Sequence, residues 1–154
     1  MSISPRLRSY LDRRGLRFEE VPHARAMSAA QAAETAHVAR SQVAKAVLVR
    51  TGDNYMLAVV PASRQVLFDR LQSWLGRPVR LAEERESEDL FADCDLGAIP
   101  PVGDAYNLET VLDDSLMDAD EIYFEGGDHR TFVHMRAEDW RKLTKDTAHS
   151  AFSA

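Results

Sequence analysis

The sequence predicts a single α/β (mixed α+β) domain in which helices surround a mixed, largely antiparallel sheet. The chain has 154 residues, of which 45% are apolar, so it is long enough for one domain with one core. Strand-like and helix-like segments alternate along its length. Two pairs of strand-like segments are joined by short turns that contain glycine, and such turns connect antiparallel strands.

Two helices are predicted before the first hairpin. Ser4 can cap a helix over 5–14 whose first residue is a proline, and Gly15 can end it in the left-handed conformation. Ser28 begins a capping-box pattern ahead of an alanine-rich segment, which predicts a second helix over 28–36.

The rest of the chain predicts two hairpins and shorter elements. The first hairpin joins a β-branched run over 43–50 to a run over 55–60. The later elements expected from periodicity and turn residues are a helix over 63–75, a strand over 79–81, an acidic helix over 83–91, an ordered loop over 93–106, a hairpin of strands over 121–125 and 131–135, and a closing helix over 138–143. We therefore expect a domain over 1–143 and a frayed tail over 144–154.

Charge is distributed unevenly along the chain. The net charge is −6, but residues 1–80 carry a net +7, residues 81–128 a net −15 and residues 129–154 a net +2. The binding of a polyanion depends on the local electrostatic potential of the protein, so residues 1–80 could face a phosphate backbone. Its clustered arginines are also typical of a solvated helix face.

Composition also limits the cellular setting. No apolar run approaches the roughly 20 residues that cross a bilayer, and the N-terminus has no apolar signal segment. The single cysteine, Cys94, excludes an internal disulfide and fits a reducing compartment. These features predict a soluble cytoplasmic protein that does not bind membranes.

Lys45 is the first candidate for a functional residue. It is the only lysine among the first 141 residues of an arginine-rich chain, and strand alternation places it on the same face as Val43 and Val47. It could be a rim lysine whose stem covers apolar surface. It could equally hold a carbonyl oxygen, a phosphate or a ribose and stabilise developing charge.

A loop with glycines and two prolines is the second candidate. Prolines fix the backbone, and glycines let it approach a ligand, so the loop could be an oxyanion or amino-acid cradle. Its spacing also fits a stiff connection, and it lacks the nucleotide-binding patterns. Its candidate residues are Gly97, Ala98, Ile99, Pro100, Pro101 and Gly103.

Other reactive side chains give weaker signals. The five histidines and the single cysteine show no metal-ligand spacing, so neither a metal nor another cofactor is expected. Cys94 could be a thiol nucleophile with His129 or His134 as its base, or a small buried hydrophobe. No GxSxG pattern supports a serine nucleophile.

Three segments in order resemble the YbaK/ProX family, the free-standing relatives of the editing domain in bacterial prolyl-tRNA synthetases. They are the strand over 43–49 with its lysine, the G-x-x-x-P-x-G loop over 97–103, and the strand and glycine turn over 122–127. The resemblance extends from the first helix to about residue 143 and implies the fold of that editing domain.

The resemblance implies an aminoacyl-tRNA deacylase that edits in trans by hydrolysing the ester of a mischarged tRNA. Lys45 matches the functional lysine of the family, and the loop over 97–103 matches the wall of the aminoacyl pocket. The implied partners are the aminoacylated 3′ end of tRNA and an aminoacyl-tRNA synthetase. The resemblance also implies that a positioned water or a group of the substrate itself, rather than a protein nucleophile, promotes hydrolysis of an ester that is already activated.

The chain departs from the family pattern at two positions. His23 stands near a tyrosine, and Phe132 near an aspartate, of the cysteinyl-tRNA deacylases. Both positions are expected to touch the pocket, which argues against specificity for cysteinyl-tRNA, and Asp128 and His129 could take over contacts there. These departures keep open the alternative of an inactive module that binds aminoacyl-tRNA or a synthetase.

Overall fold

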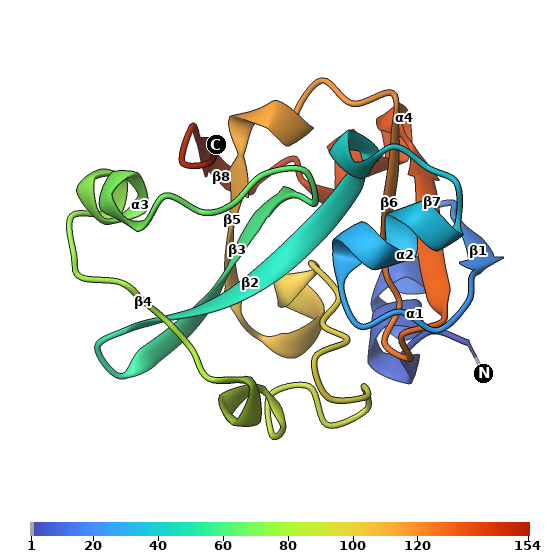
Figure 1. Cartoon of the computed structure of the whole chain (residues 1–154), viewed down its shortest axis with the longest axis horizontal. Helices are drawn as coiled ribbons and strands as arrows, with labels where there is room; N and C mark the ends of the chain where they lie inside the picture. The colour runs from blue at the N-terminus through green and yellow to red at the C-terminus, as the bar shows by residue number, and fades with distance from the viewer. Residues whose placement is uncertain (1) are drawn as a thin grey trace.

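A mixed sheet of eight strands forms the centre of the computed structural model, which describes residues 2–154 (Figure 1). The strand order is β1-β7-β6-β2-β3-β5-β8, and β4 pairs with β2. The strands are β1 (Glu19–Pro22), β2 (Val43–Thr51), β3 (Asn54–Pro61), β4 (Arg80–Leu81), β5 (Glu109–Asp113), β6 (Glu121–Glu125), β7 (Thr131–Arg136) and β8 (Ala148–Ser150).

The pairing of the strands confirms the predicted fold class. The β2–β3 and β6–β7 hairpins are antiparallel, as are the β1–β7 and β2–β4 pairs. The β2–β6, β3–β5 and β5–β8 pairs are parallel, so the sheet is mixed. The two predicted hairpins are therefore the antiparallel parts, and the parallel contacts join segments that are distant in the chain.

Helices cover both faces of the sheet. They are α1 (Pro5–Arg13), α2 (Ala29–Thr35), α3 (Phe68–Leu75) and α4 (Ala137–Leu143). Apolar residues of α1 and α4 share one core with Leu48 and Phe124 of the sheet. On the opposite face, α2 packs over Val43 and α3 packs over Val49. In Figure 1, α2 therefore lies in front of β6 and β7, whereas α1 lies behind them.

Two predicted helices are shorter than expected because tertiary contacts compete for their residues. The helix predicted over 63–75 begins only at Phe68, since the backbone of Gln65 exchanges two hydrogen bonds with Ala154 in an extended arrangement. The acidic segment over 83–91 forms only a 3₁₀ turn, Glu84–Ser87, and its Glu86 carboxylate bonds to the guanidinium of Arg80.

The prediction of a frayed tail is wrong. Residues 148–150 form β8 alongside β5, and the Phe152 side chain is only 1% exposed. The Phe152 backbone N–H also donates to the buried carboxylate of Asp113 at 2.8 Å. A short segment with one aromatic residue has no periodicity to reveal this anchoring. The strands β1 and β5 were likewise not predicted, because each is too short to show alternation.

Candidate functional site

The candidate site lies where two parallel strands separate. Strands β2 and β6 pair at only two positions, Val43 with Tyr123 and Ala44 with Phe124. The next residues in this register are Lys45 and Glu125, which therefore occupy neighbouring positions on one face of the sheet. Strand β6 ends there whereas β2 continues, so a gap opens beside β2.

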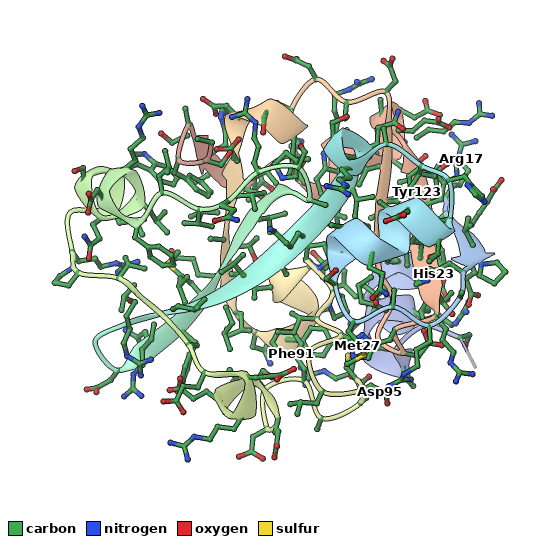
Figure 2. All side chains as sticks on the ribbon, in the orientation of Figure 1. Arg17, His23, Met27, Phe91, Asp95 and Tyr123 are labelled. Atoms are coloured by element: carbon green, nitrogen blue, oxygen red, sulfur yellow. The ribbon has the colours of Figure 1, made fainter. Side chains whose placement is uncertain are left out.

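A cavity of about 70 Å³ occupies this gap. Its floor is the sheet, including Lys45, Glu125 and Phe132. Its roof is formed by the segment before α2, which starts at Ala26, and by the first turn of α2. The third wall consists of Gly97, Ile99 and His129. Met27, labelled below α2 in Figure 2, is 62% exposed and contributes to the rim. The site is thus built from four separate parts of the chain.

Lys45 is half-buried in the floor of the cavity. Its Nζ donates to the backbone oxygen of Arg64 at 3.0 Å, and burial lowers the pKa of the ammonium below its ordinary value. No carboxylate of residues 2–154 lies within ion-pair distance of Nζ. The positive charge of Lys45 is therefore available to a ligand.

Glu125 is a functional candidate that the sequence interpretation missed. Its Oε2 accepts hydrogen bonds from the backbone N–H groups of Gly127 at 2.8 Å, Asp128 at 3.2 Å and His129 at 3.2 Å. Burial raises the pKa of this carboxyl group, although these hydrogen bonds act in the opposite direction. A carboxylate at the last position of a strand, directly before two glycines, was the signal in the sequence.

His129 is held in one orientation at the wall of the cavity. The residue is 3% exposed and has a left-handed backbone with φ +61°. Its Nε2 lies 2.7 Å from the Leu96 carbonyl oxygen, which can only accept, so Nε2 carries the proton. In the neutral form of the ring, Nδ1 is therefore an acceptor, and no residue from 2 to 154 forms a hydrogen bond with it. The neutral ring thus has a fixed tautomer and a free lone pair on Nδ1.

The predicted loop contributes only its first part to the cavity. Gly97 and Ile99 line it, whereas Ala98 and Pro100 are buried behind them. Pro101 and Gly103 instead line a separate small cavity against Tyr10 and Trp140 of the other face. The expectation that the whole loop touches one pocket is therefore not met, because the loop crosses from the site to the core.

The other two predicted contact residues lie outside the cavity wall. The His23 ring packs 4.6 Å from the Phe132 ring and supports it. The Asp128 carboxylate is used within its own turn, where it accepts from the Arg130 N–H and the Thr131 hydroxyl. Phe132, which occupies one of the departing positions, does line the cavity.

Cys94 has the surroundings of a structural thiol. Its Sγ lies 3.4 Å from the Tyr106 hydroxyl and 3.6 Å from Asp93 Oδ1, and no histidine of the described chain is hydrogen-bonded to it. Burial, followed by the smaller effect of Asp93, raises the pKa of the thiol to about 12. A thiol that stays protonated at neutral pH is a poor nucleophile. These contacts argue against Cys94 as the nucleophile of a hydrolytic reaction.

Residues 2–154 contain no cluster of three or more histidine, cysteine or acidic side chains arranged to hold a metal ion. Within the same residues, every helix is too short or too polar to cross a membrane.

The fold and the cavity define a small α+β domain in which a lysine and a glutamate line a cavity where two parallel strands separate. Residues 23–143 match the aminoacyl-tRNA editing domain, and the chain belongs to this family. The resemblance to the YbaK/ProX proteins is thereby confirmed. No curated protein matches the chain.

Solved structures share this fold over nearly the whole chain. A crystal structure described as "hypothetical protein APE2540" has a TM-score of 0.84 at 22% identity and covers 97% of this chain and 99% of its own. A crystal structure described as "a putative trans-editing enzyme for prolyl tRNA synthetase" has a TM-score of 0.81 at 25% identity and covers 99% of both chains. The family and the fold support a role in aminoacyl-tRNA editing.

Proposed function

We propose that this protein is a trans-editing deacylase that hydrolyses the ester between a wrongly attached amino acid and the terminal ribose of a tRNA. The observation that carries the proposal is the unpaired Lys45 ammonium in the floor of a cavity, in a chain of the editing family. The proposed partner is the aminoacylated 3′ end of tRNA in the cytoplasm, and the synthetase named for a similar structure is a candidate second partner.

Each group of the cavity has a proposed task in the reaction. Lys45 donates to the ester carbonyl oxygen and stabilises the negative charge that develops on it. The His129 Nδ1 lone pair accepts a hydrogen bond from a water and directs that water at the carbonyl carbon. The bond from water to carbon forms, the bond from carbon to the ribose oxygen breaks, and the water proton goes to the ribose oxygen.

A direct test replaces Lys45. Lys45→Ala is expected to lower deacylation by about 100-fold or more, because the loss of one charge-stabilising donor costs that much. Purified protein would be assayed on alanyl-, seryl-, threonyl- and cysteinyl-tRNA. The matched control is Lys145→Ala, an exposed lysine on the C-terminal side of α4. A Lys45→Ala protein that unfolds like the wild type yet keeps its activity would contradict the assignment.

The departures at His23 and Phe132 support a second candidate, a module that binds aminoacyl-tRNA without hydrolysing it. The aromatic ring of Phe132 lines the cavity. The resemblance to the cysteinyl-tRNA deacylases of the family implies an aspartate near this position. This candidate predicts tRNA binding that weakens steeply with salt, and no turnover of any tRNA in the panel.

A further inference from the structure

Lys45 and Glu125 carry opposite charges at neighbouring positions of one sheet face, yet they do not form an ion pair. No ion pair within 4.0 Å joins Lys45 Nζ to the Glu125 carboxylate, and both residues belong to the described part of the chain. Each is held by backbone groups instead, Lys45 by the Arg64 carbonyl oxygen and Glu125 by the N–H groups of the turn after β6. Two residues of opposite charge type that do not pair with each other therefore line one cavity.

The second oxygen of the Glu125 carboxylate is free. Oε2 accepts all three backbone hydrogen bonds, and no donor among residues 2–154 contacts Oε1. Oε1 is also not among the buried polar atoms that lack a partner, so solvent reaches it. A largely buried carboxylate gains most from a cationic partner, and Glu125 lines a cavity that can admit one.

An aminoacyl ester carries the complementary pair of groups. Its α-ammonium and its carbonyl oxygen are attached to adjacent carbon atoms, so a single substrate can meet a carboxylate and an ammonium at once. We propose that Glu125 Oε1 binds the free α-ammonium of the aminoacyl group while Lys45 meets the carbonyl, and that the site therefore selects esters of free α-amino acids over N-acylated ones. This inference rests on the deacylase function proposed above.

The inference predicts rejection of N-acetyl-aminoacyl-tRNA and peptidyl-tRNA. Acylation of the amine removes the positive charge, which leaves Oε1 without its partner, and it adds a group to a cavity of about 70 Å³ that Phe132 already narrows. Hydrogen bonds to charged groups are worth more than neutral ones, so the expected discrimination is about 10- to 100-fold in kcat/KM.

The experiment compares free and N-acetylated alanyl-, seryl- and threonyl-tRNA with the wild type and with Glu125→Gln. In this variant the amide oxygen can still accept from the turn, but an NH₂ group then faces the cavity. We expect the KM for free aminoacyl-tRNA to rise about 10-fold or more with a smaller change in kcat, and the preference over the acetylated form to disappear. The matched control is Glu121→Gln on the same strand, whose carboxylate pairs with His134.

The outcomes separate this inference from the proposed function. Wild-type protein that hydrolyses neither form contradicts the deacylase itself. Wild-type protein that hydrolyses both forms equally well contradicts the role of Glu125 alone, and this comparison needs no variant. Glu125→Gln protein that keeps the wild-type preference also contradicts it.

Discussion

Two glycines of the same loop have different roles at the scale of single residues. Gly97 lies at the cavity with φ +82°, a conformation that residues with a side chain adopt only with strain. A Cβ there would lie 2.5 Å from Glu84 Oε1, the end of a flexible side chain that can move away. A Cβ on Gly103 would lie 2.5 Å from the Leu108 carbonyl oxygen. This oxygen belongs to the backbone, so it cannot move away as a side chain can.

Alanine substitutions should separate these roles. Gly97→Ala is expected to cost about 1 kcal/mol of stability from its positive φ and to reduce activity by narrowing the cavity. Gly103→Ala is expected to cost about 1–3 kcal/mol or more, because overpacking against backbone forces a local shift. Urea unfolding together with deacylation by each variant measures both effects. A Gly103→Ala protein as stable as the wild type would contradict the close packing.

At the scale of single elements, the C-terminal strand β8 completes the sheet although no periodicity in the sequence predicts it. Strand β8 extends the parallel edge beside β5, and Phe152 enters the core on the side of α3. The Trp74 ring stacks 6.0 Å from the Phe152 ring and covers it. Because the last residues also pair with Gln65, this one short segment determines where α3 begins.

Truncation of Phe152 tests this anchoring. Phe152→Ala is expected to lower the free energy of unfolding by about 3–5 kcal/mol, the usual cost of removing a buried aromatic ring. Trp74→Ala is the control, and its effect should be smaller because Trp74 is 37% exposed. Urea denaturation measures both. A loss under about 1 kcal/mol for Phe152→Ala would mean that the tail contributes little to the fold.

At the scale of the whole molecule, the location of unpaired arginines matters more than the charge of each segment. Five N-terminal arginines were candidates for phosphate contacts. Arg8 pairs with Glu20 and Arg17 with Glu138, whereas Arg6, Arg13 and Arg14 form no ion pair with any residue from 2 to 154 but lie on or next to α1, away from the cavity residues. Arg25 and Arg130 are exposed and form no ion pair with any residue from 2 to 154. Both are direct chain neighbours of cavity residues, so they are better placed to meet a tRNA backbone.

Salt dependence of tRNA binding distinguishes the two groups of arginines. Arg25→Ala and Arg130→Ala should each weaken binding and reduce the slope of log K against log salt by about 1. Arg17→Ala should leave the slope unchanged, since this guanidinium is already neutralised by carboxylates. Titration at several salt concentrations provides the measurement. An equal loss of slope in all three variants would contradict a localised phosphate contact.

The sequence by itself determined the fold class, the two hairpins, the catalytic candidate Lys45 and the family, because these depend on local periodicity, turn residues and short motifs. Only the tertiary structure decided which residues share the cavity. Glu125 joins Lys45 there because two strands that are distant in sequence pair in parallel for two positions and then separate. Long-range contacts that no local pattern encodes place Gly103 at a separate cavity and bring residues 148–150 into the sheet.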